Sequence, residues 1–371
     1  MFKQTAASLL TGLLLLTGCI DTSAAHAPVT LLQSKNVLAS LQAMEVWKGK
    51  TYSLKNGKVY ARTSTIPLSI PAKVTRMAGG DEFMVFQTED KRVFFMGVLY
   101  DSYFAYAGRK PKFSSMKPTA FPLKGIEKMF VGRNELFMIT TNKDLYVMGA
   151  NDLGQLGLSD TRFAARPTKV LGGVREAATN SNDSVVVAED GIYVTGSNVN
   201  FDEPVRGVFR KVGPSEKDQR VFTVDYSFYL PTATGGSIIG WGGPANLRPL
   251  TDPAYHNAVA FKHTPYTDFL IKANGEVWVR YGYKAVGQYG NDTKVWPWEG
   301  LLYSGYELLG TGAHDASIAG TTMYLFGGKG ATAKPYPSRQ ALIDKVKQNN
   351  KHMKSLVFDA KRGIFTFHEL Q

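Results

Sequence analysis

Five carboxylates occupy matching places in a series of similar segments, each within a polar pair at the start of an apolar run. They are Glu82, Glu135, Asp183, Asp268 and Asp315. If the segments repeat around a common axis, these acids encircle it, and such a ring can bind cations or a basic peptide. The alternative is local, because a side-chain oxygen at a strand start can accept hydrogen bonds from turn amides.

A second candidate group is aromatic and lies in one stretch of the chain. Its members are Trp278, Tyr281, Tyr289, Trp296 and Trp298. Exposed rings can stack on sugars or anchor a protein partner. Because side chains alternate between the two faces of a strand, core packing of roughly half of these rings is the competing interpretation.

Other chemistry is not indicated by the residue spacing. The six histidines are scattered, and none has the spacing of a metal motif. There is no nucleophile elbow, and Gly310-Thr311-Gly312 is followed by a hairpin pattern instead of a phosphate-binding helix. The sequence therefore predicts no catalytic residues, no metal and no cofactor, and a protein that is not an enzyme.

The only cysteine, Cys19, follows a basic start at Lys3 and an apolar stretch from Ser8 to Thr17. That stretch is shorter than the roughly 20 residues that span a bilayer, and it has the layout of a signal peptide. A single cysteine excludes an internal disulfide. Its thiolate is a good nucleophile for accepting a lipid.

The segment Leu16-Thr17-Gly18-Cys19 resembles the bacterial lipoprotein box. This resemblance implies a diacylglycerol on Cys19, cleavage between Gly18 and Cys19, and acylation of the new amino group. Two or more acyl chains anchor a protein stably, whereas one does so marginally. The resemblance therefore implies a lipid-anchored protein of the bacterial cell envelope.

Ile20 follows the cysteine and Asp21 comes one place too late for inner-membrane retention, which favours the outer membrane. We expect a signal peptide over residues 1–18 and a lipidated flexible tether over residues 19–38. The remaining residues, 39–371, are expected to form the folded body.

Composition favours an all-β body. The chain of 371 residues has 37 glycines and 12% aromatic residues, a combination typical of glycine turns between aromatic strands. Its net charge of +12 favours anionic partners such as acidic lipid or acidic protein faces. Nucleic acid is not an expected partner, since there is no long Lys/Arg run and the chain is expected to be exported.

A hairpin-like unit recurs along the chain, with a polar pair, an apolar run, a polar or glycine turn and a second apolar run. Clear copies are Ala78–Gly97, Val131–Gly149, Ser181–Gly196, Thr267–Gly282 and Gly312–Gly328. Weaker copies are Lys50–Arg62, Tyr226–Gly242 and Lys354–Phe367. Isolated hairpins are marginal in water, and a period of roughly 45 residues fits one four-stranded propeller blade.

A second element, Gly-Gln-apolar-Gly, occurs within Asn151–Asp160 and again, in degenerate form, within Lys284–Asp292. Its glycines allow tight turns, and Leu156 or Tyr289 is expected to fill the gap between blades. A strand-like Pro-x-x-Val follows at Pro167–Val170.

These features resemble the repeats of the regulator of chromosome condensation family. Val131–Val170 matches the family repeat nearly throughout, and the resemblance covers roughly residues 40–371. It implies a β-propeller of about seven four-stranded antiparallel blades, although eight hairpins leave eight blades possible. The strands around Val357 and Phe365 are expected to close the ring beside the N-terminal strands. Between them and the preceding repeat, Ser338–Lys351 has the apolar spacing of a short surface helix.

The family resemblance implies an interaction role. Its eukaryotic prototype exchanges nucleotide on a nuclear GTPase, which an exported lipoprotein is not expected to do. Other members are protein-interaction platforms, including a secreted bacterial inhibitor of β-lactamases. The leading interpretation is a membrane-anchored scaffold for envelope proteins of unknown identity, in a secretion, pilus or outer-membrane assembly. The alternatives are a propeller enzyme acting on polysaccharide or peptidoglycan, and a secreted-type inhibitor or ligand-binding module.

Overall fold

The structure is a computed structural model. It describes residues 41–47, 50–61, 64–102, 111–159, 161–180, 182–197, 207–224, 227–232, 235–239, 247–250, 253–264, 266–291, 294–319, 321–353 and 355–370. The expected lipid-attachment residue Cys19, the cleavage point after Gly18 and the tether lie outside these ranges. The side chains of Val46, Val224 and residues 289–299 and 368–370 are likewise outside the description.

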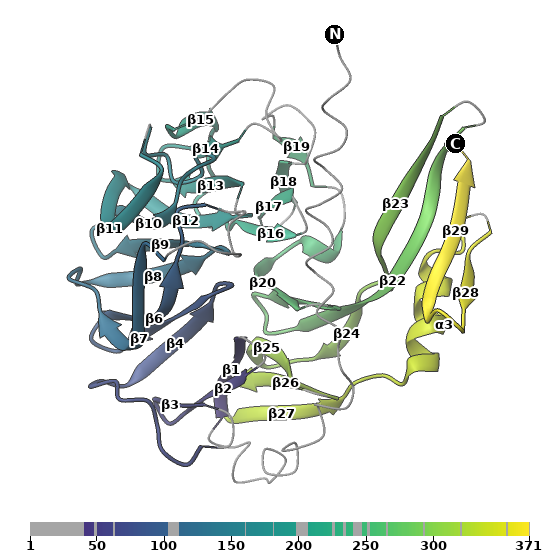
Figure 1. Cartoon of the computed structure of the whole chain (residues 1–371), viewed down its shortest axis with the longest axis horizontal. Coiled ribbons are helices and arrows are strands. Elements are labelled where there is room, and N and C mark those ends of the chain that lie inside the picture. Colours follow the sequence, from purple (N-terminus) through teal and green to yellow (C-terminus); the bar gives the residue numbers. More distant parts are fainter. Residues whose placement is uncertain are drawn as a thin grey trace.

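Neighbouring strands pair into seven antiparallel sheets, which we number in chain order (Figure 1). Sheet 1 comprises β1 (Leu41–Trp47), β2 (Lys50–Lys55) and β3 (Lys58–Ala61). Sheet 2 comprises β4 (Val74–Gly79), β5 (Phe83–Thr88), β6 (Val93–Leu99) and β7 (Phe113–Ala120). Sheet 3 comprises β8 (Ile126–Val131), β9 (Glu135–Thr140), β10 (Leu145–Ala150) and β11 (Phe163–Leu171).

The remaining four sheets follow the same order. Sheet 4 comprises β12 (Val174–Thr179), β13 (Asp183–Ala188), β14 (Ile192–Gly196) and β15 (Arg210–Gly213). Sheet 5 comprises β16 (Phe222–Val224), β17 (Ser227–Pro231), β18 (Gly236–Ile239) and β19 (Arg248–Pro249), followed by the 3-10 turn η1 (Pro253–Tyr255). Sheet 6 comprises β20 (Ala258–Thr264), β21 (Thr267–Lys272), the first part of β22 (Val277–Asn291) and β24 (Glu307–Gly310). Sheet 7 comprises β25 (Ala313–Ala319), β26 (Thr322–Gly327) and β27 (Gly330–Pro335).

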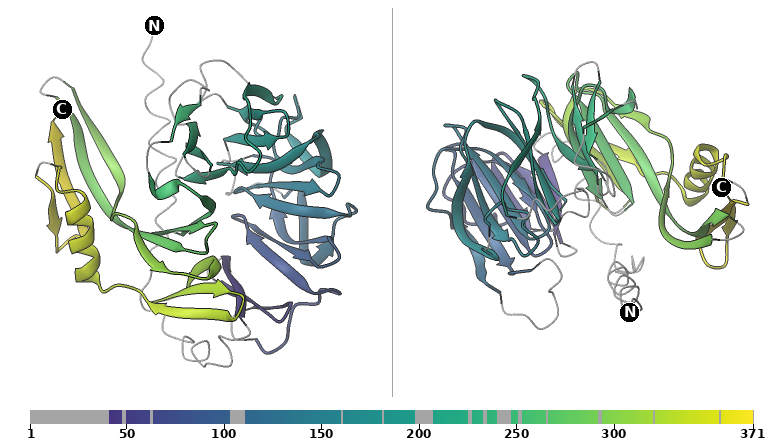
Figure 2. Two further views of the ribbon diagram at one scale, coloured as in Figure 1. Left: turned by 180° about the vertical axis from the view of Figure 1, so that it is seen from behind. Right: turned by 90° about the horizontal axis from the view of Figure 1, so that it is seen from above.

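The sheets form a closed ring, which confirms a propeller of about seven blades. The first strand of each sheet contacts the first strand of the next, in the cycle β1, β4, β8, β12, β16, β20, β25 and back to β1. Figures 1 and 2 show these strands around a common centre. Within the described part of the ring, consecutive blades are not joined by strand pairing, and their faces pack against one another.

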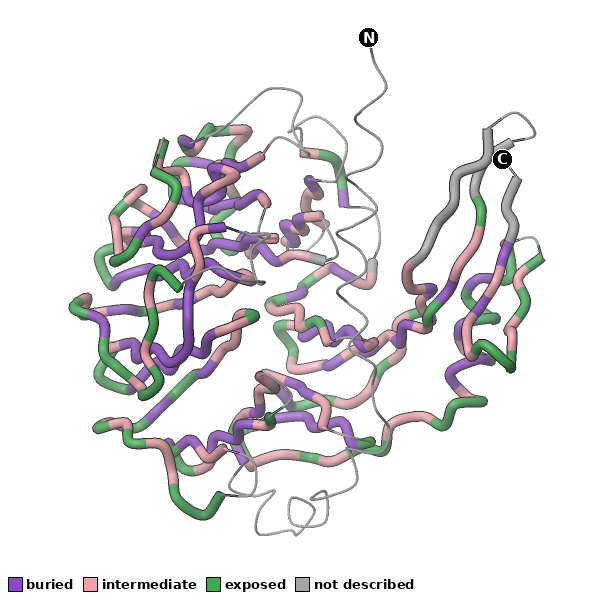
Figure 3. Tube along the Cα trace, in the orientation of Figure 1, coloured by how far each residue is buried: buried purple, intermediate pink, exposed green. Residues whose placement is uncertain are grey.

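Apolar side chains fill the spaces between consecutive sheets. Phe137 and Val147 of sheet 3, for example, cluster with Val174 and Val186 of sheet 4, and all four are fully buried. Figure 3 shows such buried residues along the strands of the ring. Burial of apolar side chains at these interfaces is the main term that holds the blades together.

Glycine is required at the end of the hairpins in sheets 2, 3 and 4. Gly149 ends the pairing of β10 with β9 and has φ of 114°, and a Cβ there would lie 2.2 Å from the carbonyl oxygen of Asn134. Any other residue would clash with the backbone that opens β9. Gly97 and Gly196 end their hairpins in the same way, with φ of 127° and 143°, so glycine is a packing requirement at this point of sheets 2, 3 and 4.

A lateral lobe extends from one side of the ring (Figure 1, right) and is built from two distant segments. We define it as residues 282–303 and 338–370. The second part of β22 pairs with β23 (Lys294–Tyr303) and, in parallel, with β29 (Ile364–Leu370), which pairs with β28 (Val357–Asp359). The helix α3 (Arg339–Asn349) covers this sheet, and its buried Leu342, Ile343 and Val346 confirm the predicted surface helix.

The predicted closure by the C-terminal strands is wrong. β28 and β29 pair with β22 in the lateral lobe, so the eighth sequence hairpin is not a blade. The ring closes between sheets 7 and 1 through the fully buried side chains of Leu41, Met44, Tyr324 and Phe326. The alternating pattern of Val357–Phe367 shows that it forms strands but carries no information about which strand it joins.

Candidate partner-binding site

The five predicted carboxylates do not share one structural position. Glu135, Asp183 and Asp268 lie at the beginning of a second strand and are fully buried, and Glu82 immediately precedes β5. Asp315 instead lies on β25, the first strand of its sheet. The sequence alignment of polar pairs therefore placed Asp315 in the wrong strand, because the fifth copy starts one strand earlier than the others.

Two of the buried carboxylates have local roles. Glu135 accepts hydrogen bonds from its neighbour's amide at Asn134 (3.1 Å) and from Gln155 Nε2 (3.2 Å). Asp183 accepts one from the amide of Ser197 (3.0 Å). These contacts agree with the local alternative, in which the acid holds the turn that enters the strand. Burial raises the pKa of Glu135 to about 7, although both hydrogen bonds oppose this shift.

Charged residues on or next to the first strands are of mixed sign and pair between sheets. Lys128 Nζ on β8 lies 2.7 Å from Glu176 Oε1 on β12, and Arg220, just before β16, also contacts Glu176. On the other side, Lys262 Nζ on β20 lies 2.8 Å from Glu45 Oε1 on β1.

Asp315 belongs to this second group, with its Oδ1 3.7 Å from Lys262 Nζ. The acids Glu45, Glu176 and Asp315 on the first strands are therefore compensated by basic partners from other sheets and do not form an acidic ring. Among the described residues, no three His, Cys, Asp or Glu side chains gather in a group suited to a metal ion.

The Gly-Gln-Leu-Gly motif forms a compact turn after β10. Asn151 Oδ1 accepts the amide of Leu156 (2.7 Å), and the fully buried Gln155 accepts the amide of Leu153 (3.0 Å). Leu156 is fully buried among residues of sheets 3 and 4, so the prediction that it fills the gap between blades is confirmed. Thr195 of sheet 4 donates to the carbonyl oxygen of Gly154 (2.8 Å) and fixes the turn from the other side.

The predicted second copy of this motif is a strand. Gly287, Gln288 and Tyr289 lie within β22, opposite Trp298, Pro297 and Trp296 of β23. Tyr289 therefore does not lie in a turn between blades. The copy lacks an asparagine at the place of Asn151, where Lys284 stands, so the side-chain bonds that close the turn are missing.

The predicted aromatic group does not form one patch. Tyr281 is buried in the core between sheets 6 and 7, whereas Trp278 is half-buried on the same strand. Tyr289, Trp296 and Trp298 lie on the β22–β23 hairpin of the lobe, and their side chains are outside the described part of the structure.

A cleft lies where the ring meets the lateral lobe. Its volume is about 490 Å³, and it is lined by residues from both parts, among them Lys272, Trp278, Arg280, Tyr303, Tyr306 and Asn349. The lobe contributes Tyr303 and Asn349, and Asn349 Nδ2 donates to the carbonyl oxygen of Tyr303 (3.0 Å). The cleft therefore exists only because β23 and α3 return to this side of sheet 6.

Arg280 is the organising residue of the cleft. Its guanidinium carbon lies 4.1 Å from the ring centre of Tyr303 and 5.2 Å from that of Tyr306. Behind it, Arg280 Nε donates to Asp268 Oδ2 (2.7 Å), while His263 Nδ1 lies 2.6 Å from the other oxygen, Oδ1. Asp268 thus fixes the guanidinium between two aromatic rings, a geometry that stabilises a cation over π faces.

The cleft also contains a second cation–aromatic pair and a neutral tyrosine hydroxyl. Lys272 Nζ lies 5.4 Å from the ring centre of Trp278, which donates through Nε1 to Glu276 (3.0 Å). Burial raises the pKa of Tyr306, so its hydroxyl remains neutral and can donate or accept a hydrogen bond. Sequence reasoning found Trp278 but missed Lys272, Arg280 and Asn349. The available indication was the two-residue spacing of Trp278 and Arg280, which places both side chains on one face of a strand.

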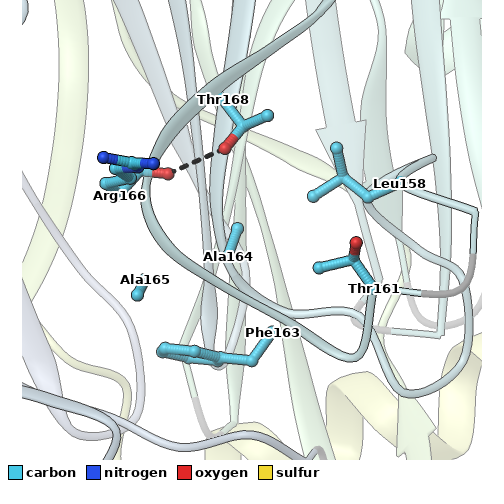
Figure 4. A pocket seen from close by; sticks show the side chains of 7 residues that line it. All are labelled: Leu158, Thr161, Phe163, Ala164, Ala165, Arg166 and Thr168. Atoms are coloured by element: carbon cyan, nitrogen blue, oxygen red, sulfur yellow. Dashed lines mark hydrogen bonds between the residues drawn. The ribbon is translucent and has the colours of Figure 1, made fainter.

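A second hollow lies beside β11 and has simpler chemistry (Figure 4). Its volume is about 480 Å³, and it is lined by Leu158, Thr161, Phe163, Ala164, Ala165, Arg166 and Thr168. Thr168 Oγ1 donates to the carbonyl oxygen of Arg166 (3.0 Å), as Figure 4 shows. With one cation and mostly small side chains, this hollow offers fewer anchors than the ring–lobe cleft.

Known proteins resemble the chain in part. It is 33% identical over 100 residues to the regulator of chromosome condensation of Mus musculus and 32% identical over 100 residues to that of Homo sapiens. Each match covers 27% of this chain and 24% of the relative, so the chain spans about a quarter of these relatives. No family model matches the sequence.

A solved structure resembles a larger part of the chain than these sequence matches cover. The crystal structure of human WBSCR16 superposes with a TM-score of 0.50 at 15% identity, over 65% of this chain and 77% of that one. Within the described residues, no helix is long and apolar enough to cross a bilayer. Together with the seven-sheet ring and the Gly-Gln-Leu-Gly turn, these comparisons show that the chain has the fold of the regulator of chromosome condensation repeat β-propellers.

Proposed function

We propose that this protein is an exported, lipid-anchored scaffold of the bacterial cell envelope that binds an acidic partner protein in the ring–lobe cleft. The observation that carries the binding role is the cleft itself, in which Arg280 is held between Tyr303 and Tyr306 by buried Asp268. Arg, Tyr and Trp are the residue types that dominate binding energies at protein interfaces. The net charge of +12 favours an acidic partner surface.

The membrane part of the proposal is supported by the sequence Leu16-Thr17-Gly18-Cys19. Lipidation of Cys19 would hold the propeller at a bilayer, with the outer membrane favoured by Ile20 at the following position. The partner would then belong to the envelope, in a secretion, pilus or outer-membrane assembly. Association with an envelope protein requires no cofactor and no chemistry by the propeller.

Crosslinking in intact envelopes tests the binding role. The full-length protein and a Tyr303→Ala, Lys272→Glu double variant are compared, since both side chains line the cleft. A matched variant, Tyr60→Ala with Lys58→Glu on β3 of sheet 1, makes the same chemical changes elsewhere. We expect the cleft variant to recover at least about tenfold less of the crosslinked partner, which corresponds to about 1.4 kcal/mol. Equal recovery with all three proteins would exclude the cleft as the binding site.

Mass spectrometry of the mature N-terminus tests the anchor. We expect an acylated Cys19 as the first residue, and release of the Cys19→Ser protein from the membrane fraction. An unmodified thiol at Cys19 would exclude the anchored form while leaving the cleft proposal intact.

A further inference from the structure

A row of polar side chains crosses sheet 6 from its first strand to the ring–lobe cleft. His263 of β20 lies opposite Asp268 of β21, and Asp268 lies opposite Arg280 of β22. Residues that pair across neighbouring strands direct their side chains to the same face of a sheet. The three side chains therefore lie in line, with Arg280 in the wall of the cleft and His263 at the far end of the row.

Asp268 connects the two ends of this row. Its Oδ2 accepts a hydrogen bond from Arg280 Nε (2.7 Å), and its Oδ1 lies 2.6 Å from His263 Nδ1. The side chain of Asp268 is fully buried, whereas 53% of the His263 side chain is exposed. Because a carboxylate can only accept, His263 donates its Nδ1–H to Asp268, and a further proton is taken up at Nε2. His263 can thus exchange protons with solvent while it contacts the acid that holds Arg280.

The formal charges around the cleft cancel as long as His263 is neutral. Lys272 and Arg280 line the cleft as cations. Asp268 pairs with Arg280, and Glu276 accepts a hydrogen bond from Trp278 Nε1. Protonation of His263 adds one positive charge to these two cations and two carboxylates. Histidine is the side chain whose ordinary titration falls between pH 5 and 8, so its proton determines whether this group of residues carries a net positive charge.

The described ionisable groups that face the row from other elements are tyrosines. Sheet 5 packs on this face of sheet 6 with Tyr229 and Tyr255, whose hydroxyls carry no charge near neutral pH. Burial raises the pKa of Tyr306, which lies beside Arg280, so this hydroxyl also stays neutral. These tyrosines therefore do not change the charge of the row between pH 5 and 8.

A second titratable group lies on the opposite face of sheet 6. Lys262, the residue before His263, pairs there with Glu45 of sheet 1 and Asp315 of sheet 7. Burial raises the pKa of Glu45, so its protonation at low pH would also favour an anionic ligand. A pH dependence that arises from Glu45 would persist when His263 is replaced, which allows the two origins to be distinguished.

We infer that the ring–lobe cleft takes up a proton on His263 when it binds its acidic partner, so that its affinity rises as the pH falls. The inference rests on the proposed function, because it requires an anionic ligand in the cleft. A carboxylate bound at Arg280 favours the charged form of the nearby imidazole. The complex therefore binds more protons than the unliganded protein, and the affinity falls as the pH rises through the titration range of histidine.

The expected effect is moderate. The added charge acts on the ligand across Asp268 and Arg280, and solvent around the half-exposed His263 screens part of it. We expect the affinity at low ionic strength to change about tenfold between the two protonation states of His263, which corresponds to about 1.4 kcal/mol.

Calorimetric titration of the full chain with a defined acidic probe tests the inference. The probe is a peptide of six aspartates blocked at both ends, whose carboxylates stay ionised above about pH 5. We expect it to bind about tenfold more tightly at about pH 5.5 than at about pH 8. In the His263→Gln protein this ratio should fall below about twofold, because glutamine does not titrate.

Two further variants serve as controls. His314→Gln on β25 replaces an exposed histidine of sheet 7 and should keep the tenfold ratio. The Tyr303→Ala, Lys272→Glu protein should lose most of the binding at both pH values, which locates the probe in the cleft.

The protons themselves can be counted in a second measurement. Titrations at about pH 6.5 in two buffers that differ in their enthalpy of ionisation give the number of protons taken up on binding. We expect up to about one proton per bound peptide in the unmodified protein and nearly none in His263→Gln.

The possible outcomes separate this inference from the proposed function. Binding with the same affinity at both pH values, or an unchanged pH ratio in His263→Gln, would overturn the inference and leave an acidic partner possible. Weaker binding of His263→Gln with that ratio preserved would show that His263 only supports the position of Arg280. Absence of binding at either pH would overturn both the inference and the acidic partner.

Discussion

Two segments with nearly the same residues have different structures in this protein. Gly154-Gln155-Leu156-Gly157 forms a turn in the ring, with φ of 79° and 69° at its glycines. Gly287-Gln288-Tyr289-Gly290 forms part of a long strand in the lateral lobe. The glycines permit both backbones. The neighbouring residues determine which backbone each segment adopts. Asn151, Glu135 and Thr195 form hydrogen bonds to the first segment, whereas β23 and β29 pair with the second.

The two segments also belong to two different hydrophobic clusters. The turn is fixed by residues of sheets 3 and 4, which belong to the repeating ring. The strand belongs to a lobe with its own cluster, in which Ala285, Val346, Phe365 and Phe367 are buried. The lobe thus has its own buried cluster, and its Tyr303 and Asn349 form one wall of the ring–lobe cleft.

The largest expected effect comes from the lobe core. Phe365 is fully buried and pairs with Ala285, next to the strand copy of the motif. Phe365→Ala should destabilise the lobe by about 3–5 kcal/mol. Hydrogen exchange should show loss of protection in α3, β28 and β29 while β4 to β15 stay protected. Equal loss in the ring would show that ring and lobe unfold as one unit, against the separation described above.

The next largest effect is a dependence of the free energy of unfolding on pH, which arises from Glu135 beside the turn. The pKa of Glu135 is raised to about 7 in the folded state, above the ordinary 4.5. Between these values the folded state binds more protons than the unfolded state, so stability falls as pH rises from about 4.5 to about 7. The contribution is at most about 3 kcal/mol. Urea unfolding across this range should show it, and Glu135→Gln should remove this component. An identical pH profile for the variant would mean that Glu135 titrates normally.

A smaller effect distinguishes the two copies directly. Asn151 accepts the amide of Leu156 and donates to the carbonyl oxygen of Thr161 (2.5 Å). Asn151→Ala should therefore lower the free energy of unfolding by about 2 kcal/mol. Lys284→Ala, at the matching place in the strand copy, should change it by less than about 0.5 kcal/mol. Similar losses at both places would indicate that the two segments depend on the same contacts.

The smallest effect concerns the link between lobe and ring. Lys345 of α3 forms an ion pair with Glu307 of β24, and both side chains are partly exposed to solvent. Lys345→Ala should cost less than about 1 kcal/mol, and less still at high salt. Thermal unfolding at two salt concentrations measures this. A larger loss would assign the orientation of the lobe to this pair, instead of to Leu342 in the core beneath it.

Local chemistry explains which predictions succeeded. Asn56-Gly57 adopts φ of 49° and 74°, as a tight hairpin turn requires, and Leu342, Ile343 and Val346 are buried on one face of α3 as their spacing indicates. The predictions that failed concern long-range partners. The alternation around Phe365 did not reveal its pairing with β22, and the acids at blade starts did not reveal that Asp268 binds Arg280.

The sequence alone determined the hairpins, their turns and the repetition that makes a ring, because these depend on residues within a few positions of one another. The tertiary structure decided which hairpins are blades, where the ring closes, and that residues 282–303 and 338–370 form a lobe beside sheet 6. These outcomes depend on the free energy of packing between distant segments, for which strand patterns specify only a buried face. The cleft around Arg280 is one such outcome, since its walls come from both the ring and the lobe.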